Sequence, residues 1–259
     1  MSAFVHPTAI VSPHARIGAD CHIGAFSVIG DAVILGNRVH LESHVVVDGA
    51  TVIGDDTRVF PFVSIGLPPQ DLKYAGEATR TEIGKRNHLR EFVTIHRGTT
   101  GGGGLTRIGD DNLLMAQAHV AHDCHIGNNV IMANAATLAG HVEIADRANI
   151  GAYSGVHQFC RIGLEAFVGG YSVIVKDALP FAISQGNHAK CYGLNRVGLR
   201  RRGYAKEAVE TLHRAYHLLL SAKLNTTQAV EKIKEEITDC AEVDLLVEFI
   251  ETSKRGVVK

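Results

Sequence analysis

The stretch "IGADCHIGAFSVIGDAVILG", residues 17–36, decides the fold because one pattern recurs in it every six residues. Ile17, Ile23, Ile29 and Leu35 are spaced by six, and a glycine follows each of them. A small or β-branched residue lies four positions after each aliphatic one. A period of six fits neither the helical repeat of 3.6 nor simple strand alternation. It is typical of a parallel β-helix built from hexapeptides.

The same aliphatic positions continue on both sides of this stretch, over residues 5–65, 83–95 and 108–174. Three hexapeptides form one triangular coil of about 18 residues, with the aliphatic side chains inside. Successive coils stack through main-chain hydrogen bonds at about 4.8 Å. The pattern therefore predicts one mainly β prism of between about eight and nine coils, roughly 40 Å long.

Two segments interrupt the repeat, and both are predicted to be loops that leave the corners of coils. Residues 66–82, "GLPPQDLKYAGEATRTE", contain two prolines, and residues 98–107, "GTTGGGGLTR", are rich in glycine. Long loops on a rigid scaffold often carry function. We expect these two loops to border a functional site.

After Ile174 the period stops, and the segment around Pro180 is predicted to be an irregular link. The chain is expected to turn helical from about Asn195, because the following residues repeat their apolar positions with a helical spacing. Thr226 or Thr227 is predicted to cap the second long helix. We therefore expect a β-helix domain over residues 1–187 and an α-helical domain over residues 188–259. The expected apolar positions of the three long helices are Ala208, Leu212, Ala215, Tyr216, Leu219, Val230, Ile233, Ile237, Val243, Leu246, Phe249 and Ile250.

Composition excludes several classes of protein. The net charge of −1 gives no general signal for binding nucleic acid or an anionic membrane. The five cysteines are scattered and form no CxxC pair, which favours a reducing compartment over a disulfide framework. No stretch approaches the ~20 apolar residues of a membrane span, and the N-terminus lacks the features of a secretion signal. We therefore expect a cytoplasmic protein.

The segment "AHVAHDCHIG", residues 118–127, holds three histidines at intervals of three. On a hexapeptide coil, His119 and His125 lie on different faces, whereas His122 lies at a turn. Residues 18 apart stack on neighbouring coils, so His122 should lie beneath Gly140, with Gln158 above both. By the same arithmetic Asp123 lies beneath His141. The predicted column combines a general base with a glycine N–H that can act as an oxyanion donor.

Several joined motifs resemble bacterial UDP-N-acetylglucosamine acyltransferases, which carry out the first step of lipid A synthesis. The motifs include "QDLKYAGEATR", "VTIHRGT", "NLLMAQAHVAHDCHIGN" and "RRRGY", and the likeness covers essentially the whole chain. The resemblance implies a left-handed parallel β-helix, a homotrimer, and active sites between subunits. It also implies transfer of a 3-hydroxyacyl group from acyl carrier protein to the 3-hydroxyl of UDP-N-acetylglucosamine, without cofactor or metal.

The resemblance also assigns roles to individual residues. His122 would be the general base, Asp123 would orient it, and the N–H of Gly140 would hold the oxyanion. One departure is Val197, where a form of the family carries an acidic residue, which leaves the nucleotide contacts there open. The implied substrate-binding residues are Asp71, Lys73, His119, His141, His157, Gln158, Gly170, Asn195 and Arg201.

Gly170 matches the position that limits acyl length in this family, so a long donor is expected. The basic segment "RVGLRRRGYAK", residues 196–206, suits an acidic partner such as acyl carrier protein. A solvated helix face is the simpler interpretation of such a segment. The sequence leaves open whether the acceptor atom is a hydroxyl or an amino group.

Four other functions can be weighed against the pattern. A gamma-type zinc carbonic anhydrase also uses hexapeptides and histidines, but the HxxxxH pair is absent near this cluster. A non-catalytic binding solenoid leaves the first loop and the histidine column unexplained. A coenzyme A-dependent acetyltransferase is compatible with the repeat. The related N-acyltransferase should carry an extra N-terminal domain, for which a repeat that begins at Val5 leaves no room.

Overall fold

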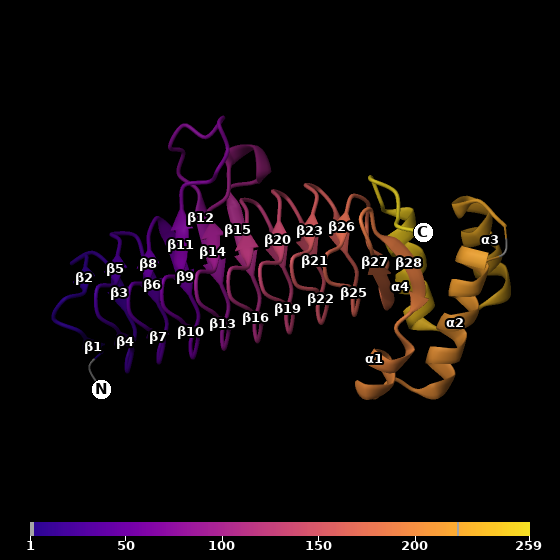
Figure 1. The fold of residues 1–259 in the computed structure, drawn as a ribbon, viewed down its shortest axis with the longest axis horizontal. Helices are drawn as coiled ribbons and strands as arrows, with labels where there is room; N and C mark the ends of the chain where they lie inside the picture. Colours follow the sequence, from indigo (N-terminus) through magenta and orange to yellow (C-terminus); the bar gives the residue numbers. More distant parts are fainter. Residues whose placement is uncertain (1–2, 222) are drawn as a thin grey trace.

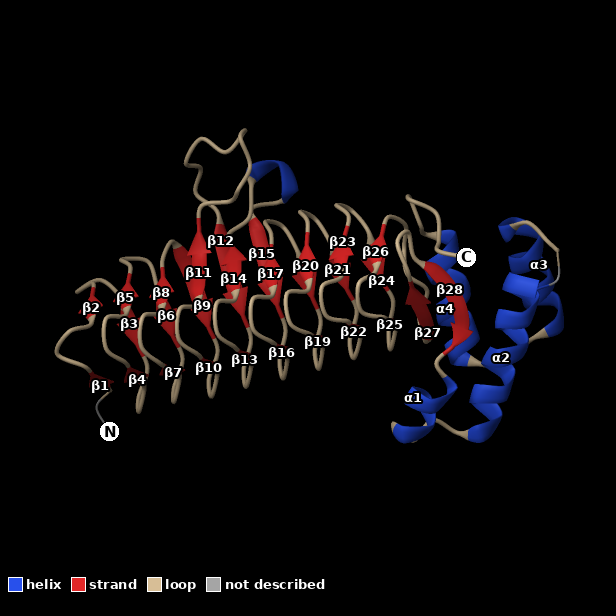
Figure 2. Ribbon diagram, in the orientation of Figure 1, coloured by secondary structure: helices blue, strands red, loops and turns tan. Residues whose placement is uncertain are grey.

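The computed structural model describes residues 3–221 and 223–259, and it shows a left-handed parallel β-helix followed by a helical C-terminal part (Figure 1). The predicted fold class is confirmed. Short strands stack into three parallel sheets that form the sides of a prism, as Figure 2 shows. Residues that pair across neighbouring coils are 18 apart outside the loops, as in Ile131 and Asn149. The hexapeptide period therefore sets the register directly.

The first sheet has eleven strands, of which the last two form an antiparallel hairpin. This hairpin replaces the irregular link predicted after Ile174. The strands are β1 (Phe4–Val5), β4 (His22–Ile23), β7 (His40–Leu41), β10 (Arg58–Val59), β13 (His88–Leu89), β16 (Leu113–Leu114), β19 (Ile131–Met132), β22 (Asn149–Ile150), β25 (Phe167–Val168), β27 (Ala182–Gln185) and β28 (Lys190–Leu194).

The second and third sheets have nine and eight strands. The second sheet contains β2 (Ile10–Val11), β5 (Val28–Ile29), β8 (Val46–Val47), β11 (Ser64–Leu67), β14 (Thr94–His96), β17 (His119–Val120), β20 (Thr137–Leu138), β23 (Gly155–Val156) and β26 (Val173–Ile174). The third sheet contains β3 (Arg16–Ile17), β6 (Ile34–Leu35), β9 (Ala50–Ile53), β12 (Arg80–Ile83), β15 (Leu105–Ile108), β18 (His125–Ile126), β21 (Glu143–Ile144) and β24 (Arg161–Ile162).

The repeated aliphatic residues form the core of the prism. From Ile23 to Ile174 each of them is at most 3% exposed. Burial of one such side chain contributes roughly 1.5–3 kcal/mol, so the repeat supplies most of the driving force for folding. Val5 is an exception at 43% exposed, because the first coil has no coil beneath it.

Both interruptions of the repeat leave the prism on the same side, above β11, β12, β14 and β15 in Figure 1. The loops are shorter than predicted, since strands occupy their ends. In β12, Arg80 and Thr81 pair with Leu105 and Thr106 of β15 and continue the third sheet. Because β12 ends the first loop and β15 ends the second, their pairing places the two loops side by side. A short 3-10 helix, η1 (Thr100–Gly102), lies inside the second loop.

The helical part contains α1 (Arg196–Arg201), α2 (Lys206–Ser221), α3 (Thr226–Glu236) and α4 (Ala241–Glu251). The predicted cap of the second long helix is wrong: Asn225 caps α3, and its side chain accepts from Gln228 N. The Oε1 of Gln228 accepts the Asn225 N–H in return, and this capping box satisfies two donors at once. The apolar faces of α2, α3 and α4 form one core with Leu179 and Phe181 from the end of the prism.

Candidate active site

The candidate site lies at the corner between the second and third sheets, which we call the site corner. It is formed by three turns on successive coils, at residues 122–123, 140–141 and 158–159. The His141 N–H bonds to His122 O and the Phe159 N–H to Gly140 O, so these turns stack directly. The vertical column predicted from the sequence is therefore present.

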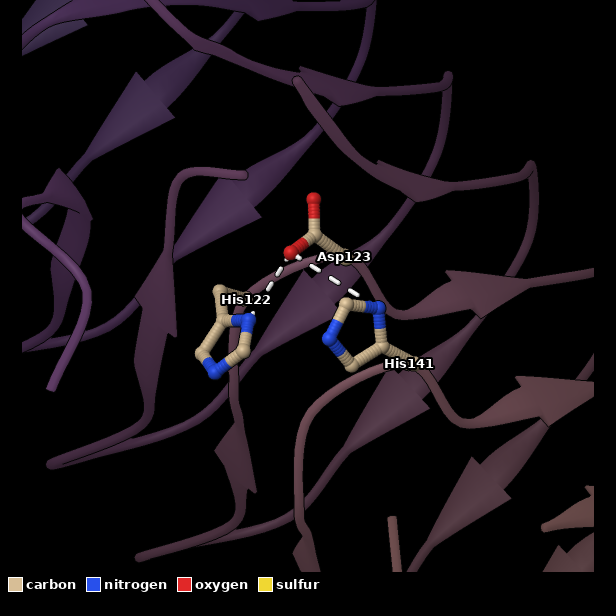
Figure 3. Close-up of side chains that lie close together, drawn as sticks. All are labelled: His122, Asp123 and His141. Carbon is tan, nitrogen blue, oxygen red and sulfur yellow. Dashed lines mark hydrogen bonds and ion pairs between the residues drawn. The ribbon is translucent and has the colours of Figure 1, made fainter. Parts of the chain in front are cut away.

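His122 and Asp123 form a tight pair at the lowest of these turns. His122 Nδ1 lies 2.8 Å from Asp123 Oδ2, and the carboxylate is buried (Figure 3). A carboxylate in this place holds Nδ1 as the donor and leaves Nε2 as the acceptor atom of the ring. His122 therefore presents a basic nitrogen away from Asp123.

The second loop fixes the Asp123 carboxylate from its other side. Thr99 donates to it twice, from its backbone N–H at 2.9 Å and from Oγ1 at 2.6 Å. Thr106 Oγ1 accepts the backbone N–H of Asp123 at 2.8 Å, where φ is +58°. The sequence prediction missed both threonines. The loop that contains Thr99 was the only signal for it, because the loop shifts the repeat and breaks the stacking arithmetic.

Gly140 lies flat against the imidazole of His122. A Cβ at Gly140 would lie 2.5 Å from His122 Cε1 and 2.8 Å from Nε2, so a larger residue would displace the ring. The N–H of Gly140 donates to no group within the described chain. The basic nitrogen and a free backbone donor thus lie side by side, which is the arrangement that acyl transfer requires.

Three further histidines surround His122, and burial lowers the pKa of each. The pKa of His96 falls to about 4, first because of burial and then because of His119 and His122. Burial is also the main cause for His119 and His141. The neutral form of these three histidines is therefore favoured at pH 7. His96 was not among the predicted site residues, although the "VTIHRGT" motif contains it.

Two cavities meet at the site corner. One, of about 530 Å³, is lined by His119, His122, Gly140 and His157, which were predicted, and by Gln70, which was not. The other, of about 600 Å³, is lined by Asp123 and His141. The structure therefore brings most of the predicted residues of the prism to one place.

The first loop also reaches the site. The charge of Asp71 acts on His141, and Asp71 Oδ1 accepts the N–H of Lys73 at 3.0 Å. The side chains of Lys73 and Gln158 are exposed. Both loops therefore contribute to the site, as expected.

Comparison with known proteins fits this geometry. Residues 177–258 match a family model described as UDP-N-acetylglucosamine O-acyltransferase, domain 2, and residues 14–49 and 105–140 match the bacterial transferase hexapeptide model. LpxA from Acinetobacter baumannii is 44% identical, with a TM-score of 0.96 and coverage of 99% of this chain and 100% of that one. The UDP-N-acetylglucosamine acyltransferase LpxA from Bacteroides fragilis is 38% identical, with a TM-score of 0.97 and the same coverage. The enzyme from Francisella novicida is 36% identical, with a TM-score of 0.95 and coverage of 98% and 94%.

The chain belongs to the UDP-N-acetylglucosamine acyltransferase family. It is an acyltransferase, and the resemblance found in its sequence is confirmed. The described helices include none that is both long and apolar enough to cross a membrane.

Three residues that the family resemblance assigns to substrate lie elsewhere in this single chain. Gly170 lies on the coil corner between the first and second sheets, and Asn195 and Arg201 belong to α1 and its cap. None of them lines either cavity at the site corner. The Asn195 side chain accepts the Gly198 N–H at 3.0 Å, which ends the strand and starts α1. Within this single chain the three residues therefore do not join the residues at the site corner.

The basic segment of this acyltransferase is less free than its sequence indicates. Arg202 forms an ion pair with the buried Glu165 and donates to Arg147 O at 2.9 Å. Lys206 lies 3.8 Å from Glu210, one helical turn along α2. Arg202 thus joins the helical part to the prism and is not available to a partner.

His122, Asp123 and His141 could also hold a metal ion, because their ligand atoms lie within 4.8 Å of one another. His141 Nδ1 is 3.8 Å from the same Asp123 oxygen that contacts His122. That oxygen also accepts from Thr99, so the hydrogen bonds it makes are to His122 and Thr99. Membership of the acyltransferase family does not favour the zinc carbonic anhydrase alternative.

Proposed function

We propose that the chain transfers a (R)-3-hydroxyacyl group from acyl carrier protein to the 3-hydroxyl of UDP-N-acetylglucosamine, the first step of lipid A biosynthesis. The sequence identity of 38–44% to two members of the family, over 99% of this chain, supports this activity. The observation that carries the mechanism is the position of His122, with Asp123 at Nδ1 and Gly140 against the ring near Cε1 and Nε2.

In this reaction His122 Nε2 removes the proton of the sugar hydroxyl as its oxygen attacks the thioester carbonyl. The carbonyl oxygen becomes an oxyanion and accepts the free N–H of Gly140. When the intermediate collapses, the carbon–sulfur bond breaks, and the thiolate takes the proton from the imidazolium. Asp123 stabilises that imidazolium, since it is buried and held by Thr99. No cofactor takes part in these steps.

The sugar nucleotide is proposed to occupy the cavity lined by His119 and His157, with Gln158 above it and Asp71 and Lys73 over it. The side chain of His119 is fixed by Thr94, whose Oγ1 lies 2.6 Å from His119 Nδ1. Asn195 and Arg201 of a neighbouring subunit are proposed to contact the nucleotide. The polar side chains that line this cavity are amide, imidazole and hydroxyl groups and include no carboxylate, lysine or arginine, which suits a hydroxyl-rich sugar.

The chain is proposed to form a homotrimer, which would bring these residues of neighbouring subunits together. The exposed apolar residues of the single chain favour such an assembly. From Arg80 onward the outward residues of the third sheet are mostly charged, although Val52 below them is 39% exposed, whereas the second sheet exposes Ile10 and Val28. Leu72 at the tip of the first loop is fully exposed. Large apolar surfaces of this kind are normally covered by a partner. A column of aromatic residues at the corner between the first and second sheets is also 50–73% exposed: Phe26, Phe62, Phe92, Tyr153 and Tyr171.

The acidic carrier protein is proposed to bind the basic face of α1, where Arg196, Arg200 and Arg201 are exposed. The five cysteines are free thiols, four of them buried, which supports the proposal of a cytoplasmic location. Nucleic acid is not a proposed partner.

The decisive experiment is an acyl-transfer assay with UDP-N-acetylglucosamine and a panel of 3-hydroxyacyl carrier proteins. We expect transfer to the 3-hydroxyl, and the position of the new ester can be read by NMR of the product. The 3-amino analogue of the acceptor tests the other open alternative. Absence of transfer from every carrier protein would contradict the proposed function.

Removal of metal distinguishes the proposed metal-free mechanism from one that depends on zinc. Dialysis against a chelator should leave the rate of acyl transfer unchanged, because His122 acts through hydrogen bonds to Asp123 and needs no metal. Metal content of the purified protein, measured by mass spectrometry, is the matching control. A chelated enzyme that loses activity and regains it with zinc would contradict this expectation.

A further inference from the structure

The 600 Å³ cavity lies on the third-sheet side of the site corner. It extends from the catalytic turn to residues near the C-terminus that have no role in the proposed mechanism. Its lower end is Asp123 and His141, one residue away from His122 and Gly140. Its upper end is formed by the segment that follows α4, including Lys254 and Arg255. A ligand whose reactive end lies at Gly140 can therefore extend along this cavity toward the C-terminal segment.

The C-terminal segment is fixed at a definite height above the base. Arg255 Nη2 donates to Val175 O at 3.2 Å, and the N–H of Asp177 donates to Gly256 O at 2.9 Å. Val175 stands three coils above Ala121, the residue before His122. At about 4.8 Å a coil, the guanidinium lies roughly 14 Å further along the prism than the base.

The charges of the cavity differ between its two ends. Within the described chain Lys254 has no ion pair or hydrogen bond, and Arg255 contacts the carbonyl of Val175 and the thiol of Cys160, neither of which is a carboxylate. Arg161 is neutralised by Asp177, whose oxygen lies 2.9 Å from its Nε. The exposed acid on the lining, Glu143, lies beside Arg161 on the coil of His141, below this segment. The upper end thus offers two cations without an acidic partner, which suits a phosphate.

We propose that Lys254 and Arg255 bind the phosphodiester of the 4′-phosphopantetheine arm that carries the acyl group. This inference rests on the proposed function, since it names the donor's contacts at the same site. From its thiol to its phosphate the arm is equivalent to about four residues of extended backbone, or roughly 14 Å. That length matches the height between His122 and Arg255.

The middle of the cavity also suits this arm. Phe159 is 52% exposed and stacks on His141 with ring centroids 4.4 Å apart. Its ring gives an apolar surface for the dimethyl group of the pantoyl unit, between the thioester and the phosphate. The carrier protein is then held outside the cavity, near the C-terminal segment.

Direct binding of the free arm tests the subsite without turnover. Calorimetry should show that the parent chain binds 4′-phosphopantetheine about tenfold more tightly than pantetheine, which lacks the phosphate. The double variant Lys254→Gln/Arg255→Gln should bind both compounds alike. Lys254→Gln alone should lose part of the preference, and it avoids any effect of Arg255 on the fold of the segment. Lys232→Gln on α3 is the matched control and should keep the full preference.

Steady-state kinetics then identify the substrate whose phosphate is bound. In the double variant the KM for a 3-hydroxyacyl-phosphopantetheine should rise about tenfold, while the KM values for the unphosphorylated donor and for UDP-N-acetylglucosamine stay unchanged. The inference is overturned if the parent binds the two arms alike, or if only the KM for the sugar nucleotide rises. An inactive parent chain would instead contradict the proposed function, and phosphate-selective binding would remain measurable.

Discussion

At the scale of single residues, the stacking arithmetic places His122 beneath Gly140 and Asp123 beneath His141, and the structure agrees. This success has a simple cause: corners on uninterrupted coils are 18 residues apart and stack without exception. Thr99 and His96 escaped prediction for the opposite reason. They lie beside the second loop, where the spacing changes, and the sequence gives no distance across such a break.

Loss of the base should be the largest single-residue effect. His122→Ala removes the proton acceptor, so kcat should fall by roughly 10²–10⁴. The fold should persist, because the side chain contributes to a turn and not to the core. Turnover and thermal unfolding of this variant should be compared with those of His14→Ala, an exposed histidine at the far end of the prism. Turnover close to that of the parent would remove His122 from its role.

His96 should make the free energy of unfolding depend on pH. Its pKa of about 4 in the folded chain lies below the ordinary 6.5, and its side chain is only 6% exposed. Between these two values the unfolded chain binds the proton and the folded chain does not. Stability is therefore complete above pH ~6.5 and falls by about 2–3 kcal/mol as the pH drops toward 4.

His96→Gln should remove this contribution, which denaturant unfolding at a series of pH values can measure. Protein concentration must be held constant, because subunit association also changes the apparent stability. His14→Gln is the matched control and should keep the slope of the parent. An equal slope in His96→Gln and the parent would assign the pH dependence to other groups.

At the scale of elements, the six-residue period predicted the strands well and the segments outside the period less well. The hairpin of β27 and β28 was missed because it pairs antiparallel and carries no repeat. The cap of α3 was placed one or two residues late, on Thr226 or Thr227. The two loops were expected to be functional, and their composition indicated flexible backbone. The contact of the second loop with Asp123 depends on how the chain returns to the prism, which no local pattern encodes.

The second loop offers a test with two adjacent glycines. A Cβ at Gly102 would overlap the carboxylate of Asp123, whereas a Cβ at Gly101 would meet nothing within 4 Å. Gly102→Ala should therefore displace the loop and loosen Asp123, with a fall in kcat of roughly 10–100-fold. Gly101→Ala should behave like the parent. Equal activity of the two variants, with equal thermal stability, would show that the loop does not position Asp123.

At the scale of the whole molecule, the residues proposed to bind substrate do not all come together in one chain. His122 lies at one corner of the prism, whereas Gly170 lies at the next corner, and Arg201 belongs to α1 beyond the last coil. The position of each prism residue along the axis could be predicted from the sequence, because the coils rise regularly. The sequence could not supply the faces that neighbouring subunits bring together, which depend on the packing of complete prisms.

We propose that the length of the acyl chain is set at this scale, between the base of one subunit and the corner of another. Gly170 lies 48 residues after His122, which corresponds to about 13 Å along the prism. Such a height matches a long acyl chain in extended form. Gly170 is exposed, and a Cβ there would lie 3.3 Å from Ala152 O, so the backbone accepts a side chain with a small shift.

A larger residue at Gly170 should therefore shorten the preferred donor without disturbing the base. Gly170→Met should lower kcat/KM for a donor of about fourteen carbons at least tenfold relative to one of about ten. Gly170→Ala, which adds a single carbon, should give a smaller shift in the same direction. The rate with the shortest accepted donor is the internal control, because His122 and Gly140 are unchanged. If both variants rank the donors as the parent does, Gly170 is only a turn glycine, and another surface of the trimer sets the length.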